Sequence, residues 1–350
     1  MISLRFQNDK KHIISLNKIQ LETRKKIEKK IEDCYYSFKA VNCIVCDSKD
    51  FELLSEKDRF GLFMSVVICK KCGLVQTNPR MTESNYLEFY EQEYRKLYSS
   101  HETINSFFKG QLGQGKIIYD FIKNATKHHI TGKFVLEIGA GAGGILKFFE
   151  EKGNTVLGFD LDEEFLNFGK SKNVNLKKGS LENLSEISQN PDIVIYSHTI
   201  EHINDPVKEL KTLRKFLNKN SLLFIEVPGI LNIHRAPYGD FLKYLQNAHL
   251  YHFCLNSLHN VLRKSGFSLI VGTEGISAIC MKGDFSNDFT NEYEKTQNYL
   301  LGIESIHSNG FSKNKLKYGI FSKTMKLLYK TKTAFIAKKI IEQIDKKKSN

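Results

Sequence analysis

Four cysteines near the start of the chain have the spacing of a metal site. They form two C-x2-C pairs separated by 22 residues: Cys43 and Cys46, then Cys69 and Cys72. Two such pairs can close a tetrahedral thiolate site, which suits Zn²⁺ by softness and geometry. A redox pair or unrelated thiols are the alternatives. Because four protein ligands leave no open position, we expect a structural zinc that supplies much of the local folding free energy, on the order of 10 kcal/mol.

A second chemical signal is the glycine-rich segment FVLEIGAGAGGILKFF, residues 134–149. It fits two cofactor fingerprints: G-x-G-x-x-G from Gly139, typical of dinucleotides, and E-x-G-x-G-x-G from Glu137. In both cases a strand ends in a turn whose backbone N–H groups can approach a cofactor closely. The glycines alone do not decide between the two cofactors, and a simple tight turn is the structural alternative.

Two acidic residues bear on that choice. Glu137 stands at the end of the first strand, where its charge would repel a pyrophosphate but help neutralise the ammonium group of S-adenosylmethionine. Asp160 ends the next strand, 21 residues after Gly139, and suits a ribose diol in either class of cofactor. It could instead cap a helix. Glu137 therefore favours S-adenosylmethionine.

The elements that position these residues alternate between strand and helix. Asp205 and Pro206 fit the N-cap and first position of one of the helices. DIVIYSH is a nearly continuous apolar run, as in a buried parallel sheet. The pattern predicts a doubly wound α/β domain with a Rossmann-like sheet. The expected strands are KFVLEI, TVLGFD, VNLKKG, DIVIYSH, SLLFIEVP, SLIVGTE and SAICMKG.

The chain divides by composition into five consecutive parts. Residues 1–40 read as a helical extension, 41–80 as a small zinc ribbon, and 81–130 as a helical, aromatic connector or lid. Residues 131–283 carry the α/β pattern, and residues 284–350 read as a basic, helical tail.

The net charge of +13 is concentrated at the two ends of the chain. The last 40 residues hold 12 lysines against two acids, and the first 30 hold nine basic residues against three acids. The remaining body is slightly acidic, which argues against nucleic-acid binding through a basic folded face. The tail could form a basic amphipathic helix on anionic lipid. Without a signal peptide or transmembrane run, we expect a cytoplasmic protein, with contact at the inner membrane face as an option.

Residues 110–283 resemble the class I S-adenosylmethionine-dependent methyltransferases. The resemblance rests on VLEIGAGAGG, VLGFDLDEEFL, KKGSLENL, PDIVIYSHTIEHINDPVKEL and SLLFIEVPG. Ser180 stands where the family usually has an acidic residue near the adenine. The resemblance implies that the cofactor is lined by Glu137, Gly139, Ala140, Gly141, Asp160, Leu161, Ser180, Leu181 and His198.

Together with the cysteine pairs, the chain resembles bacterial methyltransferases of sugar and surface-polysaccharide pathways, including sugar C-methyltransferases. In those enzymes a histidine of an H-E-H-x-x-Y stretch acts as base, and His249 in QNAHLYHFCLNSL matches its second histidine. The ordinary histidine pKa of about 6.5 suits proton transfer near neutral pH. We expect His249 as general base, with His202 and His252 as further candidates, and a packing role as the alternative. The implied acceptor is a sugar or nucleotide sugar, methylated on oxygen or carbon.

Two other functions remain open at this stage. Some RNA methyltransferases join a zinc module to this fold, and the basic ends could hold phosphates. However, no N-P-P-Y-type motif follows the fourth strand, which argues against methylation of exocyclic base amines. A binding protein that retained the fold without catalysis is the other alternative.

Overall fold

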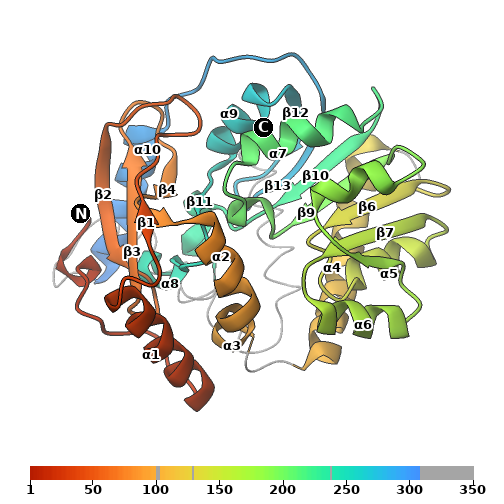
Figure 1. Ribbon diagram of the computed structural model, residues 1–350. Coiled ribbons are helices and arrows are strands. Elements are labelled where there is room, and N and C mark those ends of the chain that lie inside the picture. Colours follow the sequence, from red (N-terminus) through yellow and green to blue (C-terminus); the bar gives the residue numbers. More distant parts are fainter. Residues whose placement is uncertain (100–102, 128–129, 237–238, 308–350) are drawn as a thin grey trace.

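The computed structural model describes residues 1–99, 103–127, 130–236 and 239–307. Two sheets of different size form its framework (Figure 1). A seven-stranded sheet lies on one side of the molecule, and a four-stranded sheet with the N-terminus lies on the other. A short helical segment stands between them. The predicted basic tail falls mostly in residues 308–350, outside the described residues.

The large sheet confirms the predicted α/β architecture. Its order is β12-β13-β10-β9-β6-β7-β8. The five strands from β10 to β8 run parallel, whereas β13 is antiparallel to both of its neighbours. The strands are β6 (Phe134–Ile138), β7 (Thr155–Asp160), β8 (Leu176–Lys178), β9 (Ile193–Ser197), β10 (Leu222–Glu226), β12 (Phe267–Gly272) and β13 (Ser277–Lys282).

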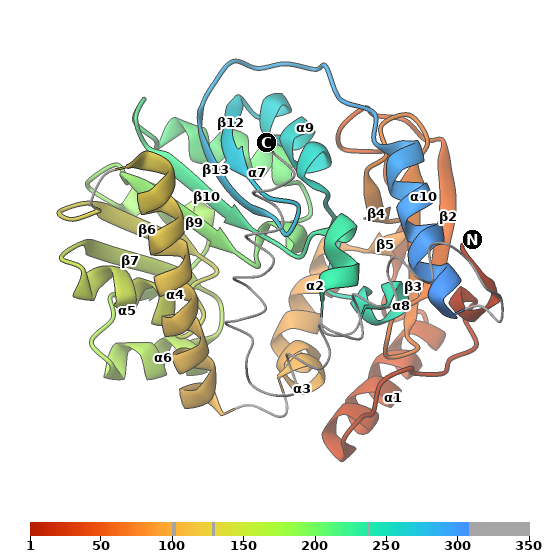
Figure 2. The ribbon, with the colours of Figure 1, turned by 180° about the vertical axis from the view of Figure 1, so that it is seen from behind.

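Helices cover both faces of this sheet because its strands are apolar on both sides. In β6, Val135 packs into one core cluster and Leu136 into the other. The first face carries α4 (Ile104–Thr126), α5 (Gly144–Glu151) and α6 (Glu163–Ser171), and Figure 2 shows α4 crossing that face. The opposite face carries α7 (Pro206–Lys215) and α9 (Leu255–Lys264). Asp205 caps α7 by accepting from Lys208 N at 2.9 Å, as predicted.

The small sheet is antiparallel and combines distant parts of the chain. Three of its strands come from the cysteine segment: β2 (Phe51–Lys57), β3 (Phe63–Cys69) and β4 (Val75–Thr77). The fourth, β11 (Tyr251–His252), pairs with β4. A further two-stranded ladder joins β1 (Phe38–Lys39) to β5 (Arg80–Met81). The sheet packs in one apolar cluster with η1 (Leu4–Phe6), η5 (Ile230–Arg235), α8 (Phe241–Tyr244) and α10 (Tyr293–Glu304).

The packing corrects the division into consecutive domains. Strand β11 belongs in sequence to the predicted 131–283 domain, but it lies in the small sheet. Helix α10 lies beyond the predicted boundary at 284, yet its Leu300 and Ile303 are fully buried in the core of that sheet. Three short strands have too little apolar surface to form a core alone, so later segments cover them. Near the N-terminus, α1 (Lys18–Glu32) buries Ile27 completely and is likewise part of the body.

The segment between the two sheets is helical, as expected for the connector. It consists of α2 (Glu83–Phe89), a π-helical turn η2 (Tyr90–Tyr94) and α3 (Arg95–Tyr98) (Figure 1). Short 3₁₀ turns η3 (Leu181–Glu186), η4 (Ile200–His202) and η6 (Ser305–His307) complete the elements. Within the described ranges, no helix combines the length and apolar character needed to span a membrane.

Candidate functional site

The glycine loop after β6 is a backbone structure that side chains would disrupt. Gly139, Gly141 and Gly143 all have positive φ, of 76°, 54° and 76°. A Cβ atom on Gly139 would lie 2.4 Å from the hydroxyl oxygen of Thr199. Glycine is therefore required here both by conformation and by space.

Asp160 is fixed against this loop from the end of the neighbouring strand. Its carboxylate accepts hydrogen bonds from Gly141 N at 2.7 Å and from Asp162 N at 2.9 Å. The alternative role as a helix N-cap is excluded, because Asp162 caps α6 by accepting from Glu164 N and Phe165 N. Asp160 instead closes the glycine loop and leaves a partly exposed carboxylate at the carboxyl end of the sheet.

Gln111 on α4 also holds the glycine loop, and no sequence motif predicts this role. Its amide nitrogen donates to Ala140 O at 2.9 Å, and its amide oxygen accepts from Gly144 N at 3.2 Å. The same helix places Gln114 against Glu226, at the end of β10, in a short hydrogen bond. Helix α4 therefore contacts both the glycine loop after β6 and the end of β10.

Glu137 is fully buried below the loop. Neither carboxylate oxygen has a hydrogen-bond partner among the described residues. Burial raises the pKa of this carboxyl well above its ordinary value, and the nearby charge of Asp160 raises it further. A buried carboxyl of this kind gains a partner when a cationic group enters the site.

The other predicted cofactor residues lie at the same edge of the sheet. Leu161 follows Asp160 and is exposed, whereas Leu181 is buried. Ser180 caps η3, with its hydroxyl accepting from Glu182 N at 3.4 Å. His198 follows β9 with a φ of 53°, and its side chain is about half exposed. These residues lie in the turns that follow β7, β8 and β9.

The three histidines named as base candidates come together behind this edge. The rings of His202 and His249 have centroids 4.8 Å apart, and those of His249 and His252 are 6.0 Å apart. Glu201 extends the group toward the loop, because its Oε1 lies 3.7 Å from His198 Nδ1 and 3.8 Å from His202 Nε2. We call Glu201, His202 and His249 the histidine cluster.

Tyrosines from the connector enclose the histidine cluster. The hydroxyl of Tyr90 lies 2.8 Å from His202 Nδ1, and that nitrogen also lies 2.8 Å from the carbonyl oxygen of Ala248. The ring centroids of Tyr94 and His202 are 6.1 Å apart, and those of Tyr94 and Tyr98 are 5.0 Å apart with the rings tilted by 46°. Tyr90 and Tyr94 are the ends of the π-turn η2, and such turns are frequent at functional sites.

Electrostatics of the cluster reflect its burial. Burial, followed by the neighbouring His202 and His252, lowers the pKa of His249 well below its ordinary value. Burial alone lowers the pKa of His252 to about 3, and neither of its ring nitrogens has a partner in the described ranges. At His198, partial burial of the ring lowers the pKa, but the carboxylate of Glu201 has a larger effect in the opposite direction. The pKa of His198 is therefore raised above its ordinary value.

Tyr94 connects the cofactor edge with the cluster electrostatically. Burial raises the pKa of its hydroxyl, and the carboxylates of Glu201 and Asp160 both add to that increase. The two carboxylates thus act on one side chain between them. Tyr94 therefore lies within electrostatic range of both the cofactor edge and the histidine cluster.

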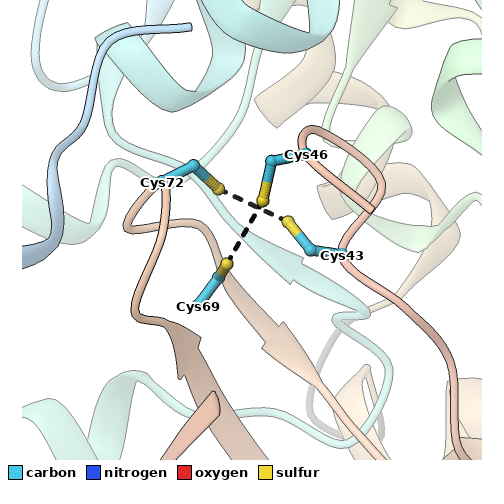
Figure 3. Close-up of side chains that lie close together, drawn as sticks. All are labelled: Cys43, Cys46, Cys69 and Cys72. Carbon is cyan, nitrogen blue, oxygen red and sulfur yellow. Dashed lines mark hydrogen bonds between the residues drawn. The ribbon is translucent and has the colours of Figure 1, made fainter. Parts of the chain in front are cut away.

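The four predicted cysteines lie together at the end of the small sheet (Figure 3). Cys43 Sγ lies 3.4 Å from Cys72 Sγ, and Cys46 Sγ lies 3.5 Å from Cys69 Sγ. These separations exceed a disulfide length of about 2.05 Å and are close to those of sulfurs around a tetrahedral metal ion. All four sulfur atoms can bind one ion.

Both cysteine pairs are built by the same backbone turn. Asp47 N donates to Cys43 O at 2.8 Å, and Gly73 N donates to Cys69 O at 2.8 Å. Asp47 and Gly73 both have positive φ, of 59° and 77°. The repeated turn directs the two sulfurs of each pair to one point, which explains why the spacing alone located this site.

The strand order and the single reversed strand β13 define the class I methyltransferase fold. Residues 113–271, which contain the glycine loop, Asp160 and the histidine cluster, match the family model described as a methyltransferase domain.

Two curated proteins and one solved structure are among the matches. A ubiquinone biosynthesis O-methyltransferase of Nitrosospira multiformis is 27% identical over 143 residues, which are 35% of this chain and 60% of that protein. One of Coxiella burnetii is 27% identical over 101 residues, 27% of this chain and 43% of that protein. The chain thus spans about half the length of these curated relatives. The structure of the plantazolicin methyltransferase BpumL in complex with SAH aligns at a TM-score of 0.42 and 15% identity, covering 57% and 94% of the two chains.

Proposed function

We propose that this protein is an S-adenosylmethionine-dependent methyltransferase that acts on a small-molecule acceptor of the sugar type. The observation that carries the proposal is the connection between two sets of residues: Asp160 closes the glycine loop, and His198 with Glu201 leads from that edge to the buried histidine cluster. A methyl donor and an acceptor can meet there, beside groups that can take a proton.

The residues of the glycine loop suit S-adenosylmethionine. Gly139 and Gly141 keep the backbone open, and Asp160 offers a carboxylate to the ribose hydroxyls. Glu137 has two buried oxygens without partners in the described part of the chain, which the ammonium group of the cofactor would satisfy directly or through water. When bound, S-adenosylmethionine supplies a methyl group whose bond to sulfur breaks, with its electron pair moving to sulfur, as the acceptor atom bonds to the carbon.

The acceptor loses a proton in this reaction, and the histidine cluster is placed to receive it. His202 is oriented by its contacts with the Tyr90 hydroxyl and Ala248 O. Burial lowers the pKa of His249 and keeps its ring uncharged, and an uncharged imidazole nitrogen can accept a proton. Tyr90, Tyr94 and Tyr98 supply a wall against which a ring can pack. The C–H face of a sugar ring can pack against such aromatic rings. Because the curated relatives are ubiquinone biosynthesis O-methyltransferases, a ubiquinone precursor is the competing acceptor.

The first experiment is calorimetric titration with S-adenosylhomocysteine, with NAD as the control ligand. We expect micromolar binding of the first and none of the second. Replacing Asp160 with Ala removes two charge-assisted hydrogen bonds and the ribose partner, so binding should weaken by at least about 100-fold. The matched control is Asp192→Ala, because Asp192 accepts from Phe134 N at the other end of β6.

Binding of NAD instead of S-adenosylhomocysteine would refute the proposed cofactor. If S-adenosylhomocysteine binds, the acceptor is sought by mass spectrometry with nucleotide sugars and, separately, aromatic precursors of the ubiquinone type. A mass increase of one methyl group on a nucleotide sugar supports the proposed acceptor class. Methylation of the aromatic compound alone would refute that class and leave the reaction type in place.

We further propose that the four cysteine thiolates hold a structural Zn²⁺ ion. The two identical turns and the sulfur separations of 3.4 and 3.5 Å support this assignment. Three of the cysteines are buried, and all four ligand positions come from the protein, so no site is left for a substrate. Metal analysis of the purified protein should find one zinc per chain.

A further inference from the structure

The histidine cluster has the composition of a metal site as well as that of an acid–base site. One ligand atom from each of Glu201, His202 and His249 lies within 4.8 Å of the others. Glu201 and His202 come from the turn η4 after β9, and His249 comes from the loop before β11. Two imidazoles and one carboxylate are a common ligand set for divalent transition metals.

Glu201 is the strongest sign that a cation is needed here. Its side chain is 1% exposed, and neither oxygen has a hydrogen-bond partner in the part of the chain that is described. The nearest nitrogens, on His198 and His202, are at 3.7 and 3.8 Å, beyond hydrogen-bond length. An uncompensated buried carboxylate costs several kcal/mol, and a cation among these groups would offset that cost.

His202 is oriented as metal-binding histidines are. A carbonyl oxygen can only accept, so the 2.8 Å contact with Ala248 O places the proton of His202 on Nδ1. Nε2 is then left with its lone pair on the side of Glu201. A histidine that binds a metal almost always donates its other N–H to a carbonyl, carboxylate or water. Ala248 precedes His249, so the segment that carries one ligand also orients the other.

We propose that Glu201, His202 and His249 bind a divalent transition-metal cation that holds the methyl acceptor through two neighbouring oxygen atoms. This inference rests on the proposed function and narrows its acceptor to compounds with adjacent oxygens, such as a vicinal diol. Three protein ligands leave coordination positions open for both oxygens. Bound there, such a cation would supply Lewis acidity to a hydroxyl of the acceptor and so ease the loss of its proton.

The test uses the full chain with zinc on its cysteines and Mn²⁺ or Co²⁺ as the probe. Mn²⁺ prefers oxygen and imidazole ligands to thiolates, so it reports on the histidine cluster rather than on the cysteines. Electron paramagnetic resonance should show one Mn²⁺ bound per chain. Because loss of an outer-shell partner already weakens metal affinity about 10–100-fold, the ligand variant Glu201→Gln should weaken it by at least about 100-fold.

Two further variants complete the experiment. His202→Gln should weaken Mn²⁺ binding as strongly as Glu201→Gln, and it keeps the proposal testable if the first variant does not fold. His259→Gln on α9 is the control, because His259 lies outside the cluster, and its Mn²⁺ affinity should match that of the unchanged protein. Circular dichroism of each variant verifies folding.

The outcomes separate this inference from the proposed function. If neither Mn²⁺ nor Co²⁺ binds to the unchanged protein, or if both ligand variants bind them equally well, the metal site is refuted. S-adenosylhomocysteine titrated into the same samples reports on the proposed function independently. Its binding without metal binding leaves the methyltransferase assignment intact, whereas metal binding without it supports the cation site alone.

Discussion

The cysteine site and the histidine cluster are both compact groups of potential ligands, but they are built in opposite ways. The cysteines lie on two local turns with the same hydrogen bonds, Cys43 with Asp47 and Cys69 with Gly73. The histidine cluster joins η4 to the loop before β11 and is enclosed by tyrosines from η2. The geometry of a site built from local turns is held mainly by the ion it binds. The geometry of a site built by packing is held by the fold of the whole molecule.

The largest effect is expected at the cysteine site. Replacing Cys69 with Ser removes one of the four proposed zinc ligands, and because a structural zinc contributes on the order of 10 kcal/mol, the small sheet should unfold. We expect the variant to lose its zinc, which metal analysis measures. We also expect it to unfold at a lower temperature than the unchanged protein, which calorimetry measures. Cys34→Ser is the control, since Cys34 is exposed and outside the site. Unchanged stability of the Cys69 variant would mean that the site carries no structural metal.

A pH-dependent stability is expected beside the histidine cluster. Burial raises the pKa of Asp58 to about 6 despite its hydrogen bonds from Leu62 N, Phe60 N and Asn247 N. The folded state therefore keeps this proton where the unfolded state, with an ordinary pKa of 3.8, has lost it. The contribution of Asp58 to the free energy of unfolding is fully present below pH 3.8. It is lost as the pH rises through about 6, which lowers the free energy of unfolding by up to about 3 kcal/mol.

The variant Asp58→Asn keeps an acceptor oxygen but cannot ionise. Denaturant unfolding between pH 4 and 6.5 should show a flatter profile for it than for the unchanged protein. Asp192→Asn, at the far end of the large sheet, should leave the profile as it was. Equal slopes for the Asp58 variant and the unchanged protein would contradict the raised pKa.

At the histidine cluster itself, the expected effect is on turnover. His249→Ala removes a group that is buried at 5% exposure beside His202, and turnover should fall at least about 100-fold, or about 2.7 kcal/mol. Binding of S-adenosylhomocysteine should be unchanged, because His249 does not contact the glycine loop. His259→Ala serves as control. A loss of less than tenfold would remove His249 from the mechanism.

The smallest expected effect is a difference in stability between substitutions in the two cysteine turns. Gly73 has a φ of 77°, and a Cβ atom there would lie 2.3 Å from the backbone of Glu292, at the start of α10. Gly73→Ala should therefore destabilise the protein by about 2 kcal/mol. Asp47→Gly relieves the positive φ of the equivalent turn and should change stability by less than about 1 kcal/mol. Denaturant midpoints measure both, and equal effects would show that α10 does not restrict the second turn.

The comparison also explains what the sequence could predict. The strands of the large sheet, the caps of α7 and the four cysteines followed from local patterns, because each depends on neighbouring residues. Gln111 was missed because its amide reaches the glycine loop only after α4 packs against α5. The grouping of His202 with His249 followed in part from family resemblance, and Tyr90 had no signal. The boundary at residue 284 was wrong because burial of Leu300 depends on a sheet formed much earlier in the chain.

Strand β11 has a consequence for the order in which the protein is made. The cysteine turns and β4 emerge from the ribosome early, but the partner of β4, residues 251–252, and the cover provided by α10 are synthesised much later. During that interval β4 is an open edge, of the kind that pairs with other chains. The small sheet is therefore completed only after residue 304 has been synthesised, and not when its first three strands have been made.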